Sequence, residues 1–183
     1  DNEWYDYNCQ TELSFEDLQI LHKACLEENI EFMASVFDIE RIAWLEELNV
    51  KRYKIASRSI YEDELIDAVL KTNKPVLISL GMWKGDNLPS FTGNINYLYC
   101  ISKYPTPLSD ISFKDVDFNL YHGFSDHTEG VVAPITALSR GARIIEKHFT
   151  LDKKMYGPDH SGSMTPEELK IICNFRDGLD QCL

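Results

Sequence analysis

Residues 123–128 read GFSDHT and residues 145–150 read IEKHFT, and each stretch ends a run with β-strand character. Side chains alternate between the two faces of a strand, so Ser125 and His127 are predicted to point one way. Glu146 and His148 share a face for the same reason. If the two strands are neighbours, two imidazoles and one carboxylate converge at the strand ends.

Neutral imidazole is a common protein ligand of divalent metals. A lone histidine is more often a structural residue than a ligand. The matched pair, with a polar residue two positions before each histidine, favours a metal site at His127 and His148.

Short β-branched or aromatic runs alternate with amphipathic helical stretches along the chain. This rhythm is typical of βα units and a parallel sheet. The predicted strands are Glu31–Phe37, Arg52–Ser57, Pro75–Leu80, Asn96–Ile101, Leu120–Phe124 and Ala142–His148. The predicted helices are Phe15–Glu28, Ile39–Leu48, Glu62–Lys71, Pro134–Arg140 and a last helix that begins after Thr165, whereas residues 83–94 lack an apolar period and are predicted to form a loop.

Six strands in this arrangement fit either an open doubly wound sheet or part of an eight-stranded barrel. No Gly-rich nucleotide-binding motif follows any of them. Both architectures bind ligands at the carboxyl ends of their strands, and a polar residue stands at every predicted end. These residues are Ser35, Lys54, Ser57, Ser79, Ser102, Tyr104, Ser125, His127, Glu146 and His148.

The composition excludes several classes of protein. The 183 residues carry a net charge of −12, which argues against binding to nucleic acid or to an anionic membrane surface. The five cysteines are odd in number and include no CxxC pair, so a disulfide framework is not expected and a reducing, cytoplasmic location fits best. No apolar run is long enough to span a membrane, and we expect one domain over residues 1–183.

Five motifs in the chain resemble motifs of the sialic acid synthase family, and they occur in the same order and at the same spacing as in that family. They are YKIAS at 53–57, YPTP at 104–107, FSDHT at 124–128, EKHFT at 146–150 and GPDH at 157–160. The family includes N-acetylneuraminate, legionaminate and pseudaminate synthases and the spore-coat polysaccharide synthases. The resemblance implies a (β/α)8 TIM-type barrel, present here as a partial barrel of about six βα units.

The resemblance also implies a reaction, in which phosphoenolpyruvate condenses with an N-acetylated amino sugar such as N-acetylmannosamine. The products are a 2-keto-3-deoxy sugar acid and phosphate. The implied metal is a divalent ion, usually manganese, with magnesium or cobalt as alternatives, bound by His127 and His148. Glu146 is expected to position a water molecule or support the metal, with a salt bridge to a neighbouring lysine or arginine as the structural alternative. The implied phosphoenolpyruvate ligands are Ser35, Lys54, Ser57, Ser79, Ser102 and Ser125, and Tyr104 and Asp159 are expected to face the sugar.

Two other functions stay open: a non-catalytic relative that keeps the fold and its ligand binding, and a metal-dependent aldolase. The chain also departs from the family pattern, because Arg58 and Ser59 stand where the family usually has glycine and an acidic residue that contacts the sugar. Two barrel strands and a C-terminal antifreeze-like domain of the family have no counterpart in these residues. We therefore expect little synthase activity from this chain alone, and association as a homo-oligomer, such as a dimer, or with a companion segment.

Overall fold

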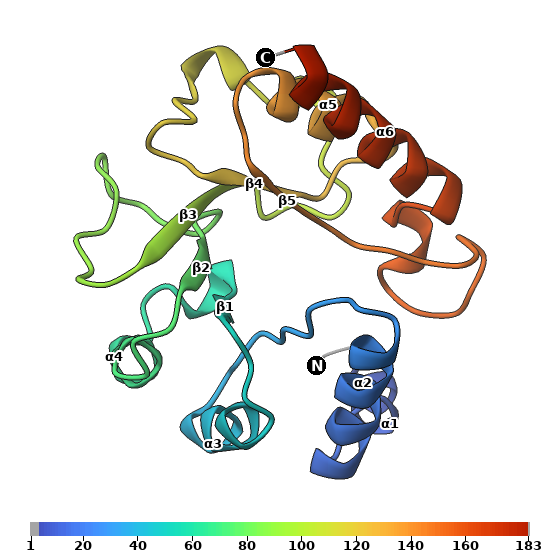
Figure 1. The fold of residues 1–183 in the computed structure, drawn as a ribbon. Helices are drawn as coiled ribbons and strands as arrows, with labels where there is room; N and C mark the ends of the chain where they lie inside the picture. The colour runs from blue at the N-terminus through green and yellow to red at the C-terminus, as the bar shows by residue number, and fades with distance from the viewer. Residues whose placement is uncertain (1–3, 183) are drawn as a thin grey trace. The chain divides into compact units, whose positions relative to one another are not determined.

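The computed structural model describes residues 4–182, and Figure 1 shows their helices and strands. These residues divide into two compact units. The first unit runs up to Leu77 and includes Ser90–Ile95, and the second comprises Ile78–Pro89 and the residues from Asn96 onward. The five strands of the sheet follow chain order, β1-β2-β3-β4-β5. Consecutive order of this kind is the arrangement of βα units in a (β/α)8 barrel. The predicted fold class, a partial barrel of the α/β class, is confirmed.

Helices make up most of the first unit, and α2 and α3 begin at residues whose side chains cap them. The unit contains α1 (Tyr5–Gln10), α2 (Phe15–Glu27), α3 (Ile39–Glu47), β1 (Tyr53–Ile55), a 3-10 turn (Ser57–Ser59), α4 (Asp63–Leu70) and the first half of β2 (Val76–Ser79). The Ser14 hydroxyl accepts a hydrogen bond from the Asp17 amide at the start of α2, and Asn49 follows α3 with a φ of 53°. Helices α3 and α4 pack together beside the fully buried Tyr53 and Ile55.

The second unit contains three parallel strands and the helices packed on them. Its elements are β3 (Ile95–Cys100), 3-10 turns at Leu108–Asp110 and Phe113–Asp115, β4 (Gly123–Asp126), α5 (Val132–Ser139), β5 (Ile144–Lys147), a 3-10 turn at His160–Gly162 and α6 (Pro166–Cys182). Helix α5 packs against β4 and α6, and its Ala133 and Ala137 join Phe113 and Phe124 in the core. Within residues 4–182, no helix combines the length and apolar character needed to cross a membrane.

One predicted strand is wrong. The segment Glu31–Phe37 forms only an isolated bridge, between Ser35 and Lys54, so the sheet has five strands among the described residues. The Val36 amide reaches the Lys54 carbonyl at 3.4 Å, and this single long bond does not extend into a ladder. The segment contains residue types that favour strands, but no neighbouring strand within residues 4–182 pairs with it along its length. The predicted loop at residues 83–94 is confirmed, since it contains no helix or strand.

Gly123 allows β4 and β5 to approach each other closely. It pairs with Ile144, and a β-carbon at position 123 would overlap the Ile144 carbonyl oxygen and β-carbon. We expect Gly123→Ala to lower the free energy of unfolding by about 1–3 kcal/mol, because backbone must move to admit the methyl group. Gly178→Ala is the matched control, since α6 has open space at that position. Urea unfolding of both variants checks the prediction, and equal stability of the two would contradict it.

Candidate active site

The predicted meeting of the GFSDHT and IEKHFT segments is confirmed. Strands β4 and β5 are parallel, and Ser125 lies directly opposite Glu146. The Ser125 hydroxyl donates a hydrogen bond to Glu146 Oε2 at 2.5 Å, and the Ser79 hydroxyl at the end of β2 donates to the same oxygen at 3.3 Å. Three side chains from three strands therefore form one hydrogen-bonded group at the carboxyl ends of the strands.

The two histidines that follow these strands lie side by side. The ring centroids of His127 and His148 are 5.7 Å apart, with 40° between their planes. His127 Nδ1 lies 2.9 Å from the Ile101 carbonyl oxygen, which can only accept a hydrogen bond. Nδ1 therefore carries the proton of the neutral ring, and the lone pair is on Nε2. This is the arrangement in which a backbone carbonyl orients an imidazole for metal binding.

The surroundings of His148 favour the neutral form of its ring. Its pKa lies below the ordinary value of 6.5, chiefly because the atoms around the ring displace water that would solvate the charge. Asp159 and Glu146 oppose this effect, whereas His127 and Lys147 add to it. A neutral imidazole keeps a lone pair for a metal ion.

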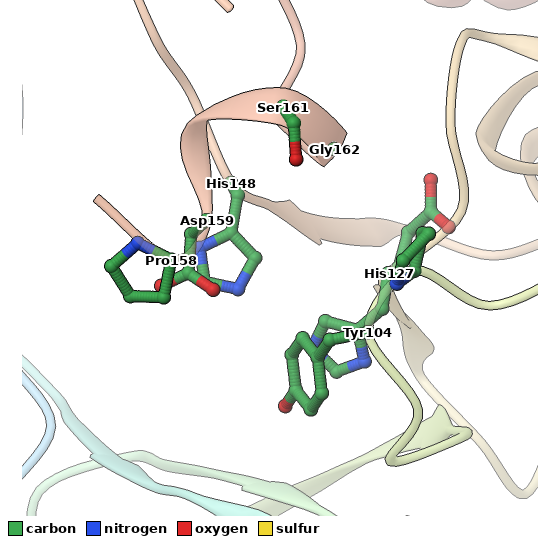
Figure 2. A pocket seen from close by; sticks show the side chains of 9 residues that line it. Tyr104, His127, His148, Pro158, Asp159, Ser161 and Gly162 are labelled. Atoms are coloured by element: carbon green, nitrogen blue, oxygen red, sulfur yellow. The ribbon is translucent and has the colours of Figure 1, made fainter. Parts of the chain in front are cut away.

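A small pocket of about 40 Å³ opens between the two histidines and the loop that carries Asp159 (Figure 2). The exposed ring of Tyr104 lies against His127, with a centroid separation of 4.1 Å, and approaches His148 at 6.0 Å. Figure 2 shows the Asp159 carboxylate beside the His148 ring. The pocket thus combines an aromatic face, two imidazoles and an acid.

The donor set fits a divalent ion with two protein ligands. Among residues 4–182 there is no group of three or more histidine, cysteine or acidic side chains placed to hold a metal. Two imidazoles leave most positions of an ion open to water or substrate, which is the open arrangement that catalytic metal sites need. His127 and His148 therefore suit a catalytic ion better than a structural one.

The other predicted binding residues fall in both units. Ser102 follows β3, and its buried hydroxyl oxygen has no hydrogen-bond partner among the described residues, which leaves it available to a ligand. In the first unit, Lys54 is 4% exposed and donates to the Ile55 carbonyl at 3.0 Å, Ser57 is buried and Ser35 is exposed. The assignment of Ser35, Lys54 and Ser57 to a common anion site stays a prediction.

An ion pair beside the pocket was not predicted from the sequence. Asp126 and Lys147 are register partners on β4 and β5, and Lys147 Nζ lies 2.7 Å from Asp126 Oδ2. Their side chains are 0% and 1% exposed. The signal was present in the two motifs, because the pairing that aligns SDH with EKH also puts an aspartate opposite a lysine.

Comparison with known proteins identifies the family. The sequence model of the NeuB family matches residues 1–177. The chain belongs to the NeuB family. It is 38% identical over 170 residues to the N,N′-diacetyllegionaminic acid synthase of Campylobacter jejuni, a match that covers 84% of this chain and 50% of that protein. It is 34% identical over 166 residues to the N-acetylneuraminate-9-phosphate synthase of Drosophila melanogaster, covering 83% and 45%.

A solved structure agrees with this assignment. The N-acetylneuraminic acid synthetase of Leptospira borgpetersenii superposes with a TM-score of 0.83 at 26% identity, and the match covers 93% of this chain and 64% of that one. The chain spans about half the length of the curated NeuB relatives it matches.

Proposed function

We propose that the protein is a sugar-acid synthase that condenses phosphoenolpyruvate with an open-chain N-acetylated amino sugar. The products are a sialic-acid-like 2-keto-3-deoxy acid and inorganic phosphate. The names of the legionaminic acid and N-acetylneuraminate-9-phosphate synthases support this class of reaction. The observation that carries the proposal is the Glu146 carboxylate, which is held by two serine hydroxyls next to a pair of imidazoles.

The reaction joins two substrates and consumes one water molecule. The enol carbon of phosphoenolpyruvate attacks the aldehyde carbon of the sugar, and the aldehyde oxygen takes up a proton to become a hydroxyl group. Water then adds to the adjacent carbon, loses a proton, and phosphate leaves to give the ketone. A divalent ion held by His127 and His148, which we propose is manganese, with magnesium or cobalt as alternatives, would supply polarisation of the aldehyde oxygen.

Glu146 is proposed to accept the proton of the attacking water. The Ser79 and Ser125 hydroxyls donate to its carboxylate in this structure. Each hydroxyl has one proton, so a serine that turns to donate to an anionic substrate must release Glu146. Binding of phosphoenolpyruvate beside these serines would therefore release the Glu146 carboxylate, which could then accept a hydrogen bond from the attacking water. A carboxylate in this role contributes about 10²–10⁴-fold to rate.

The sugar is proposed to bind in the pocket of Figure 2. The Asp159 carboxylate can accept hydrogen bonds from sugar hydroxyl groups, and the exposed Tyr104 ring offers an apolar face to the carbon chain. The buried Ser102 hydroxyl, which has no partner among the described residues, would donate to phosphoenolpyruvate.

The function is tested with the complete product of the reading frame that contains these residues. Phosphate release from phosphoenolpyruvate is measured with manganese and N-acetylmannosamine or a related N-acetylated sugar. We expect release to require the sugar, and Glu146→Gln to reduce it about 100-fold or more. Glutamine keeps an oxygen that can accept hydrogen bonds from both serines. A loss of phosphate release therefore reports on the carboxylate as a proton acceptor.

The matched control is Glu129→Gln, since Glu129 is exposed after β4. Full turnover in Glu146→Gln would remove Glu146 from the mechanism. A wild-type protein that releases no phosphate with any N-acetylated amino sugar would rule out the proposed synthase reaction.

A further inference from the structure

The buried ion pair of Asp126 and Lys147 contacts the segment that carries His127. Lys147 Nζ donates to Asp126 Oδ2 at 2.7 Å and also to the Thr128 carbonyl oxygen. Asp126 Oδ1 accepts from the Thr128 amide at 2.8 Å. His127 lies between Asp126 and Thr128 in the chain, so both of its neighbours are joined to Lys147. Lys147 in turn immediately precedes His148.

The ion pair lies beside the pocket, and Asp126 is one of the residues that line it. Alternation along β4 and β5 places Ser125 and Glu146 on one face of the sheet and Asp126 and Lys147 on the other. Both charged side chains are almost completely buried, and each satisfies the other. A buried pair is weak evidence for stabilisation, because similar apolar residues often fold as well. Its position one residue before each imidazole points to a geometric role.

Backbone hydrogen bonds from neighbouring loops also hold the two histidines. The His127 carbonyl accepts from the Thr106 amide at 2.8 Å, and the His148 carbonyl accepts from the Met164 amide at 2.8 Å. The first bond joins His127 to the segment after β3, and the second joins His148 to the segment just before α6. The ordered register of β4 and β5 ends at Asp126 and Lys147, one residue before the histidines. The ion pair is thus the last cross-strand connection before the two rings.

We propose that Asp126 and Lys147 are positioning residues that set the separation of the His127 and His148 imidazoles for one shared ion. This inference rests on the metal role given to the histidines in the proposed function. Groups that orient metal ligands in this way typically change metal affinity 10–100-fold when they are removed.

The test uses the double variant Asp126→Asn/Lys147→Met. Asparagine keeps the acceptor for the Thr128 amide, and methionine keeps the unbranched stem, so no charge is left buried alone. We expect a folded protein whose affinity for Mn²⁺, measured by calorimetric titration, is 10–100-fold weaker than that of the wild type. The control variant Lys103→Met/Asp110→Asn removes an exposed pair of the same unit and should bind Mn²⁺ normally.

A second measurement needs no metal. The protein is prepared with isotope-labelled histidine and studied by NMR. The nuclear Overhauser effect between the His127 and His148 ring protons should be present in the wild type and weaker in the double variant. A purely structural role would lower stability and leave both the affinity and this signal of the folded protein unchanged, which would overturn the inference. If the double variant does not fold, Asp126→Glu, which keeps both charges and changes the length of the pair, is tested by the same two measurements.

The two measurements separate this inference from the proposed function. If the wild type binds no Mn²⁺, the metal role of the histidines is wrong. The nuclear Overhauser effect between the two rings then decides whether Asp126 and Lys147 position them. A ring signal that is unchanged in the folded variant then excludes positioning, whereas a weakened signal supports it without the metal.

Discussion

His148→Ala is expected to weaken Mn²⁺ binding by about 100-fold or more. Loss of a group that only orients a metal ligand costs 10–100-fold in affinity, and loss of one of two ligands should exceed that. His127→Ala should have the same effect, because the bond of Nδ1 to the Ile101 carbonyl leaves Nε2 as the proposed ligand atom. Calorimetric titration of Mn²⁺ into each purified variant measures the change.

His22→Ala is the control for this experiment. His22 belongs to α2, in the first unit, and its ring lies against Phe32. Its removal deletes an imidazole from the protein without touching the two proposed ligands. Mn²⁺ affinity that is equal in the wild type, His148→Ala and His22→Ala would show that the histidine pair is not a metal site.

Asp126→Ala is expected to lower the free energy of unfolding by about 3–5 kcal/mol. The substitution leaves the Lys147 ammonium group buried beside the Thr128 carbonyl without its counter-charge. It also removes the acceptor of the Thr128 amide. Urea unfolding followed by circular dichroism measures the loss.

Asp110→Ala provides the comparison, because it breaks the pair with Lys103 at the surface, where water solvates both charges. We expect its unfolding midpoint to stay close to that of the wild type. Equal unfolding midpoints for Asp126→Ala and the wild type would mean that water or local rearrangement compensates for the lost aspartate.

The sequence predicted the helices well where a cap and an apolar stripe occur together. Thr165 and Glu168 exchange the two hydrogen bonds of a capping box at the start of α6, as the motif indicated, and Gly141 follows α5 with a φ of 102°. Helix α1 was not predicted. It has no side-chain cap and buries no residue, so neither signal was available.

Strand boundaries were harder to predict, because a strand is defined by its neighbour as well as by its own residues. The predicted strand Leu120–Phe124 begins too early, since the amides of Leu120 and Tyr121 bond to the Asp117 carbonyl in a turn. The segment Glu31–Phe37 does not form a strand, because no neighbouring strand in the described part of the chain pairs with it beyond the single bridge at Ser35. The period-2 argument succeeded at β4 and β5 because both strands are short and parallel, with the predicted residues opposite each other.

The site was predicted best where it depends on alternation alone. Ser125, His127, Glu146 and His148 meet as expected. The contact of Ser79 with Glu146 could not be predicted from spacing, because it joins side chains 67 residues apart. Asp126 and Lys147 were not predicted, because the alternation argument was applied only to the strand face that carries the histidines.

The alternation of β4 and β5 has a consequence for how the chain finds its fold. If β5 paired one residue out of step, its side chains would exchange faces, and Glu146 would lie beside Asp126 in one direction of slip. Two buried carboxylates would then meet, and Lys147 would be turned toward the polar pocket. Only the correct pairing brings opposite charges together in the interior. The ion pair therefore discriminates against misaligned strands during folding, before any substrate or ion is present to select the native arrangement.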